Sequence, residues 1–189
     1  MGDNELTGSL PATLSSMTQL EHLILENNNI VGDIPTQVSR MVELKTFDLD
    51  NNQITSVPRD VSRMAGLETF SVQSNSITGT IHTEFGLLVN LQGLFLGENE
   101  FAFQIPSELG LLTSLRDGLD VSDNQLIGSI PTELGLLSEL SKYRATVDCI
   151  LATADTDSIL TFSLSPSLSL SLTRTISYLG QPHCWINSR

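Results

Sequence analysis

The side chains in this chain that could do chemistry are 22 carboxylates, three histidines and two cysteines. Catalysis by paired carboxylates needs a desolvated pocket that separates their pKa values, and a histidine base or a zinc site needs partners at defined spacings. His22, His82 and His183 have no such partner in the sequence. Phosphate-binding glycine loops, kinase motifs and zinc-ligand spacings are also absent from it. We therefore expect a protein that is not an enzyme and that uses no cofactor or metal.

One polar residue type does recur at a constant phase. Asparagines stand about 24 residues apart, at Asn28, Asn52, Asn75, Asn99 and Asn124. Around them the sequence follows the pattern LxxLxLxxNxLxGxIPxxLxxL, in full copies that begin at Leu20, Leu44, Leu67, Leu91 and Leu115. The second half of an earlier copy precedes them, and a sixth copy begins at Leu140 and soon fails. A fixed period of this length predicts a stack of similar units rather than a conventional globular core.

Each copy contains the signals of a strand and of a return path. The alternation of Leu23 and Leu25 predicts a strand with one inward face. Ile34-Pro35 and its counterparts predict the start of a short 3₁₀ or α turn, where proline is tolerated. Strands joined by return paths of constant length stack in parallel about 4.8 Å apart. We expect the five asparagines to form a ladder that donates to and accepts from backbone groups in the turns, with each rung worth about 1 to 3 kcal/mol.

Three copies depart from the pattern. The copy at Leu44 lacks one residue around Thr55–Val57, and with it the glycine of the motif. Phe103 stands at that glycine position in its own copy, and His82 stands where other copies have proline. The copy at Leu115 has one extra residue, for which we expect a bulge at Gly118 that either re-aims Arg116 and Asp117 or is neutral.

The segments LTGSLP, IVGDIP and LIGSIP make the repeat resemble the plant-type leucine-rich repeat of receptor-like kinase and receptor-like protein ectodomains. The resemblance covers Leu6 to about Leu140. It implies an α/β solenoid: a right-handed superhelix with a parallel sheet on the concave side and short 3₁₀ or α turns on the convex side. It also implies an extracellular or cell-surface protein, although the sequence shows no signal peptide, transmembrane helix or N-glycosylation sequon.

The outward positions of the strands form the expected ligand-binding face. Acidic residues dominate this face, and Phe95 is its exposed aromatic residue. The candidate ligand-binding residues are Glu26, Lys45, Asp48, Asp50, Glu68, Ser71, Gln73, Phe95, Glu98, Asp120 and Asp123. As a functional site they would dock a basic peptide or protein, with Phe95 as the anchor, or a glycan. The alternative is an ordinary solvated polar surface.

The charge distribution limits the class of partner. The formal net charge is −13, and residues 1–139 hold 19 acids and 5 bases whereas residues 140–189 hold 3 acids and 4 bases. Such a field repels polyphosphates and anionic lipids, so we expect neither nucleic-acid binding nor membrane insertion.

The chain divides into a solenoid of about six coils at residues 1–141, the first incomplete, and a non-repeat tail at 142–189. The tail contains alternating serine and leucine, which is typical of a half-buried strand that caps the last coil. A translated CT dinucleotide repeat gives the same alternation, and we favour this origin for a poorly ordered tail.

Three functional hypotheses follow. The first is a ligand-recognition module, a fragment of a receptor-like protein that binds a peptide, protein or glycan on its concave face. The second is a stand-alone soluble inhibitor or scaffold. The third is a truncated product with no independent role.

Overall fold

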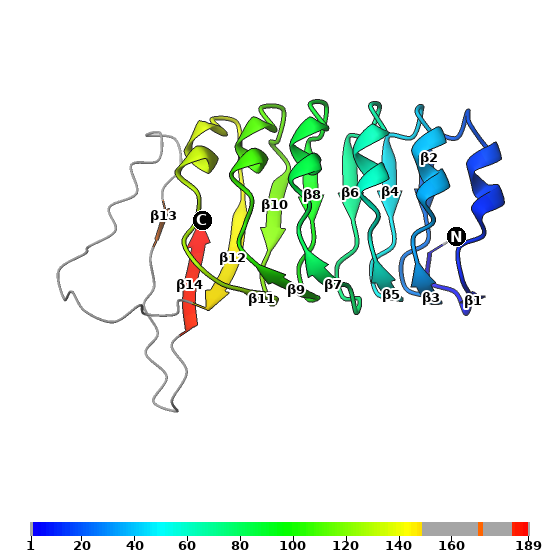
Figure 1. Cartoon of the computed structure of the whole chain (residues 1–189), viewed down its shortest axis with the longest axis horizontal. Helices are drawn as coiled ribbons and strands as arrows, with labels where there is room; N and C mark the ends of the chain where they lie inside the picture. Colours follow the sequence, from blue (N-terminus) through cyan, green and yellow to red (C-terminus); the bar gives the residue numbers. More distant parts are fainter. Residues whose placement is uncertain (1, 149–169, 172–182, 189) are drawn as a thin grey trace.

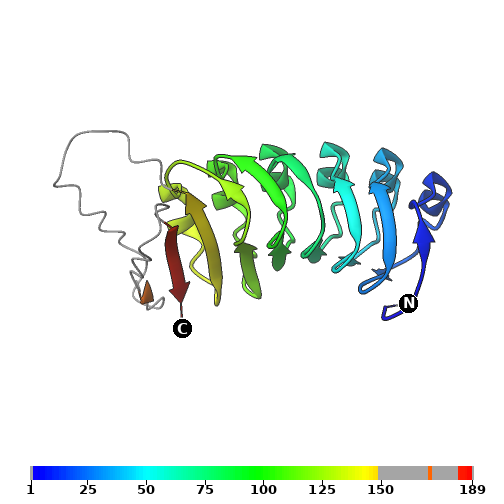
Figure 2. The same ribbon diagram turned by 90° about the horizontal axis from the view of Figure 1, so that it is seen from below.

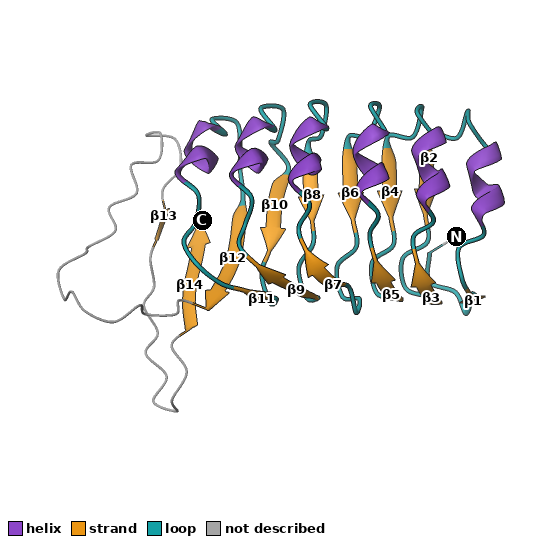
Figure 3. Ribbon diagram, viewed as in Figure 1, coloured by secondary structure: helices purple, strands orange, loops and turns teal. Residues whose placement is uncertain are grey.

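The chain forms a row of stacked coils. The computed structural model describes residues 2–148, 170–171 and 183–188. Strands line one side of the row and 3₁₀ turns line the other (Figures 1 and 3). The coils follow a gentle arc with the turns along its outer, convex side (Figure 2). These turns are η1 (Ala12–Ser16), η2 (Thr36–Arg40), η3 (Arg59–Arg63), η4 (Thr83–Leu87), η5 (Ser107–Leu111) and η6 (Thr132–Leu136).

The concave side is one sheet that runs through the whole row. Its parallel strands are β2 (His22–Ile24), β4 (Thr46–Asp48), β6 (Thr69–Ser71), β8 (Gly93–Phe95), β10 (Gly118–Val121) and β12 (Tyr143–Asp148). At the far edge β14 (His183–Ser188) pairs antiparallel with β12, and β13 (Leu170–Ser171) pairs antiparallel with β14. β12 continues the parallel sheet past residue 141, where we expected the repeats to end. Cys149 and most of the serine-leucine tract lie outside the described residues.

The extra residue in the copy at Leu115 lies before β10. Gly118 pairs in register with Gly93, so the expected bulge at Gly118 is wrong. The N–H groups of Arg116 and Asp117 both donate to the carbonyl of Gln92, as those of Lys45 and Thr46 do to Glu21. Thr46 itself begins the ladder opposite His22, whereas here the ladder begins one residue later, at Gly118, so the extra residue lies between Leu115 and Gly118.

A second row of strands follows the concave strands along the flank. It consists of two separate parallel sheets, made of β1 (Thr7–Gly8), β3 (Asn29–Asp33) and β5 (Gln53–Ser56), and of β7 (Thr78–Thr80), β9 (Glu100–Phe103) and β11 (Gln125–Leu126). The interruption falls between β5 and β7, next to the copy that lacks a residue, and the register between β3 and β5 also shifts at Gly32/Asp33. The interruption of the flank sheet thus coincides with the copy that lacks a residue.

His82 spans this interruption. Its Nε2 lies 2.9 Å from the carbonyl oxygen of Val57 in the preceding coil, and its ring stacks on Phe85 with centroids 6.5 Å apart. Because a carbonyl only accepts, Nε2 carries the proton. The histidine that replaces proline thus has a structural role.

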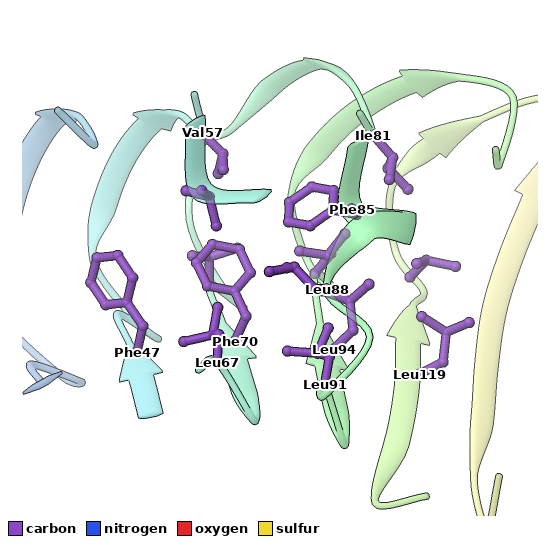
Figure 4. Close-up of a cluster of buried hydrophobic side chains, with 14 of the residues drawn as sticks. Phe47, Val57, Leu67, Phe70, Ile81, Phe85, Leu88, Leu91, Leu94 and Leu119 are labelled. Carbon is purple, nitrogen blue, oxygen red and sulfur yellow. The ribbon is translucent and has the colours of Figure 1, made fainter. Parts of the chain in front are cut away.

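Inward side chains of all three layers form one continuous core. Phe47 and Phe70 of neighbouring strands meet edge to face at 5.8 Å, and Phe70 reaches Phe85 of η4 at 5.7 Å (Figure 4). Leu67 and Leu91 are fully buried beside them. Each coil covers the apolar face of the next, so no coil can hold its fold alone.

The phased asparagines bind the coils together through backbone groups. Asn52 Nδ2 donates to the carbonyls of Leu25, Leu49 and Asp50, and its Oδ1 accepts from the N–H of Ile30. Asn75, Asn99 and Asn124 make the equivalent four bonds, and Asn28 accepts from Leu6 and donates within its own coil. Each interior asparagine therefore satisfies backbone groups of two coils at the point where the chain leaves the sheet.

We expect Asn75→Ala to lower the free energy of unfolding by about 1 to 3 kcal/mol, because the N–H of Ile54 loses its acceptor and three backbone carbonyls each lose one of their two donors. Chemical denaturation measures this change. Asn90→Ala is the matched control, because the exposed Asn90 donates a single bond, to the carbonyl of Ala65. Equal effects of the two changes would contradict the ladder's role.

The flank turns need a left-handed residue. Gly8, Gly32, Gly79 and Gly128 stand there with φ between 81° and 92°. Phe103 occupies the same position with φ 70°, although its side chain is 60% exposed. A residue with a Cβ is strained in this conformation by about 1 to 2 kcal/mol.

Phe103→Gly should therefore raise the free energy of unfolding by about 0.5 to 1 kcal/mol, after the greater flexibility of glycine in the unfolded chain is subtracted. Thermal and urea denaturation test this. Gly79→Ala, at the same position of the preceding coil, should have the opposite sign. A destabilising Phe103→Gly change would show that the ring's contacts outweigh the backbone strain.

Candidate functional site

The outward residues of the concave sheet form straight rows. One row is Ile24, Asp48, Ser71, Phe95 and Asp120, and the row beside it is His22, Thr46, Thr69, Gly93 and Gly118. The remaining predicted ligand residues lie just before these strands or in the turn that follows them. The parallel register thus gathers the predicted residues on one face.

The charges at the start of the strands neutralise one another. Lys45 Nζ lies 2.5 Å from Glu21 Oε2, and this contact lowers the pKa of Glu21 and raises the pKa of Lys45. Farther along, Gln92 Nε2 donates to Glu68 Oε2 (3.1 Å), and Arg116 Nη2 donates to Gln92 Oε1 (2.7 Å). Lys45 and Glu68 therefore take part in a polar row that crosses the coils.

Asp50, Ser71 and Gln73 form one hydrogen-bonded group. Asp50 Oδ1 accepts from Ser71 Oγ (2.5 Å) and from the N–H of Gln73 (2.6 Å), and Oδ2 accepts from Gln73 Nε2 (3.2 Å). These bonds join the turn after β4 to β6 in the next coil. Asp50 is thus an acceptor that supports the sheet as well as a charge on the face.

Asp48 and Asp120 occupy the same position in their copies and adopt the same local geometry. Asp48 Oδ1 accepts from the N–H of Asp50 (3.0 Å), and Asp120 Oδ1 accepts from the N–H (3.0 Å) and Oγ (2.5 Å) of Ser122. An aspartate that bonds the backbone two residues ahead fixes the turn that leaves the strand. Burial raises the pKa of Asp48, and the charges of Asp50 and Glu26 add to this effect.

The side chain of Phe95 lies over two glycines, Gly93 on its own strand β8 and Gly118 on the next strand β10. A Cβ atom at Gly93 would lie 2.7 Å from Phe95 Cε2, and one at Gly118 would lie 3.0 Å from Phe95 Cε1. In the preceding coils the row of Gly93 holds His22, Thr46 and Thr69, which have side chains. The glycines therefore leave the space that the ring occupies over the sheet. We call Phe95, Gly93 and Gly118 the aromatic plate.

The residue before each ladder asparagine is left-handed. Asn27, Asn51, Ser74, Glu98 and Asp123 have φ between 52° and 54°. In the sequence Glu98 and Asp123 were predicted only as surface charges, and this constraint was missed, although the asparagines of the first two copies, Asn27 and Asn51, are its usual signal. Glu98 Oε2 accepts from Ser74 Oγ (2.6 Å), so its carboxylate is held across the coils.

The described residues hold no group of three or more histidine, cysteine or acidic side chains arranged to bind a metal. Among the same residues no helix has the length and apolar character needed to cross a membrane. His22, one of the histidines considered above, lies with Nδ1 3.0 Å from Thr46 Oγ1 on the exposed face.

Taken together, the coils, the ladder and the open sheet define a solenoid repeat protein. The family model described as "Leucine rich repeat" matches residues 18–77 and 42–101. The repeats are leucine-rich repeats, as the sequence motifs predicted, and they are similar to those of plant receptor-kinase ectodomains. No curated protein sequence matched it.

Solved structures give the same result. The plant peptide hormone receptor RGFR1, in complex with RGF2, is 34% identical with a TM-score of 0.71 over 75% of this chain and 24% of that one. The ectodomain of the receptor kinase GASSHO1/SCHENGEN3 from Arabidopsis thaliana, in complex with CASPARIAN STRIP INTEGRITY FACTOR 2, is 31% identical with a TM-score of 0.74 over 78% and 18%. A plant ice-binding protein is 27% identical with a TM-score of 0.67 over 77% and 49%. The chain thus spans a quarter or less of these two receptors.

We expect Asp48→Asn to raise the thermal stability at neutral pH. Burial makes the ionised carboxylate costly there, and asparagine keeps an oxygen to accept from Asp50. Burial raises the pKa of Asp48 in the folded state. The ionised carboxylate therefore destabilises the fold at pH values above this raised pKa, and the destabilisation disappears as the pH falls below the ordinary value of 3.8. The gain in melting temperature should therefore shrink towards acid pH. Asp117→Asn, at an exposed carboxylate, is the control, and a pH-independent gain would contradict the cause.

Proposed function

We propose that this chain is a ligand-recognition module that binds a basic peptide along its concave face. Its neighbours include a plant peptide hormone receptor, which supports a peptide as the ligand class. Because the chain spans only part of such receptors, the proposal concerns binding alone. The proposal makes no claim about signalling.

The observation that carries the proposal is the aromatic plate. Its ring lies over Gly93 and Gly118 and is partly exposed, and exposed carboxylates, Glu98 and Asp123, stand in the turns after its own strand and the next. An aromatic face attracts a lysine or arginine side chain, and a neighbouring carboxylate strengthens that attraction. The apolar stem of such a side chain would cover the ring while its charge faced the turns after β8 and β10, where the carboxylates of Glu98 and Asp123 are exposed.

The charges around the plate support the same partner. Glu26, Asp48 and Asp50 lie on one side of it along the solenoid, and Asp120 and Asp123 on the other. The predicted cation of the face, Lys45, already contacts Glu21, and Arg116 contacts Gln92. The face therefore keeps a negative field, which speeds the approach of a basic peptide and repels nucleic acid. A neutral glycan would use the ring but gain nothing from this field.

We also infer that the chain binds without catalysing a reaction. Its candidate carboxylates lie on an open sheet, where Asp50 and Asp120 are occupied by bonds to serine and backbone groups. An open face does not supply the desolvated acid–base pair that catalysis requires.

The test is selection from a phage-displayed library of random peptides on the purified chain. Enriched peptides should carry lysine or arginine. They should lose about 30-fold in affinity for Phe95→Ser, as expected when a central anchor worth about 2 kcal/mol is removed. Affinity should also fall with ionic strength.

Phe103→Gly is the matched control, because it removes an exposed phenylalanine from the flank instead of the face. It should leave the affinity of the selected peptides unchanged. Peptides without basic residues, or equal affinity for Phe95→Ser and the unmodified chain, would overturn the proposal. Preferential binding to neutral oligosaccharides on a glycan array would favour a glycan ligand instead.

A further inference from the structure

The convex side carries an apolar feature that the concave site does not use. The turns η4, η5 and η6 each end on a leucine, and Leu87, Leu111 and Leu136 are 64%, 56% and 65% exposed. The three turns read TEFGL, SELGL and TELGL. In η1, η2 and η3 the same position holds serine or arginine. We call these three residues the leucine ridge.

Glycines hold the turns of the ridge close together. A Cβ at Gly86 would lie 2.4 Å from the carbonyl oxygen of Glu108, and one at Gly110 would lie 2.5 Å from that of Glu133. Both positions therefore exclude any larger residue at the present spacing. Figure 3 shows these turns aligned side by side along the row. The ridge is thus a regular line of leucines, one per coil, and not a scatter of exposed side chains.

A row of carboxylates accompanies the ridge. Glu84, Glu108 and Glu133 each stand three residues before a ridge leucine, and residues three apart in a 3₁₀ turn eclipse one another. Each glutamate accepts from the hydroxyl that precedes it, at 3.2, 3.3 and 3.4 Å. Arg59 approaches only the first of the row, at 3.8 Å from Glu84. The outer face of η4 to η6 therefore presents leucines flanked by negative charge.

We propose that the leucine ridge docks an amphipathic α-helix that lies along the solenoid axis and carries basic residues beside its apolar stripe. An α-helix advances about 5.4 Å per turn, and coils stack about 4.8 Å apart at the sheet and wider on the outside of the arc. One apolar residue per helical turn thus meets one leucine per coil. Lysines or arginines flanking that stripe face the glutamate row.

The negative charge of the glutamate row argues against a second copy of this chain as the partner that binds the leucine ridge. Two ridges in contact would bring Glu84, Glu108 and Glu133 against the same residues of the other copy. Such like-charge contacts oppose association at low ionic strength.

The experiment measures binding of a synthetic amphipathic helix with leucine at successive turns and lysine beside it. The chain with the leucine ridge intact should bind it, and the triple change Leu87→Ser, Leu111→Ser and Leu136→Ser should weaken binding by about tenfold or more. These leucines are exposed, so the melting temperature should stay unchanged. All these measurements are made in the Phe95→Ser background, because the lysines of the helix could otherwise bind the proposed concave site. In that background the helix should still bind and the three serine changes should still weaken it, so failure of the ridge is distinguishable from failure of the concave site.

Two further probes exclude non-specific charge attraction. A scrambled peptide of the same composition, and a version with glutamate in place of lysine, should both bind at least about tenfold more weakly than the designed helix. Equal binding of the scrambled peptide, or equal binding by the serine variant, would overturn the proposal. Self-association in sedimentation velocity that the serine variant abolishes would overturn it in favour of a second copy.

Discussion

The structure depends on one constraint, the backbone groups left without strand partners where each coil turns away from the sheet. A single asparagine per coil satisfies them, as Asn52 does for Leu25, Leu49 and Ile30. Its geometry fixes the phase of each coil relative to the next. The surface rows follow from that phase, because side chains one repeat apart must then lie beside one another.

The features that distinguish this solenoid arise where the repeat departs from its pattern. The flank sheet is interrupted next to the copy that lacks a residue near Thr55–Val57, and His82 bonds across the interruption. Glycine in place of a larger residue at Gly93 and Gly118 leaves room for the Phe95 ring, and leucine in place of serine or arginine forms the ridge. The regular positions hold the fold and the irregular ones shape its surfaces. This division explains how one scaffold can serve both hormone receptors and an ice-binding protein.

Much of the fold could be predicted because the repeat encodes it locally. The constant spacing of the asparagines from Asn28 to Asn124 predicted the number and boundaries of the coils. The alternation of inward and outward residues in each strand predicted that Asp48, Phe95 and Asp120 lie on the same face of the sheet. The contacts within that face were beyond sequence reasoning. Whether Asp50 bonds Ser71 or solvent depends on rotamers in two coils. The left-handed backbone at Glu98 was hidden because glutamate gives no signal for it. The bulge was wrongly predicted at Gly118 because the sequence does not show whether an extra residue lies before the first paired residue of a strand or within the strand.

The central claim is that the ladder-supported concave sheet is the recognition surface. Hydrogen–deuterium exchange of the chain with and without a library-selected basic peptide tests it most directly. The account predicts added protection in residues 69–74, 93–98 and 118–123, which form β6, β8, β10 and their following turns. Protection confined to the flank strands β7, β9 and β11, or to the 3₁₀ turns, would contradict it.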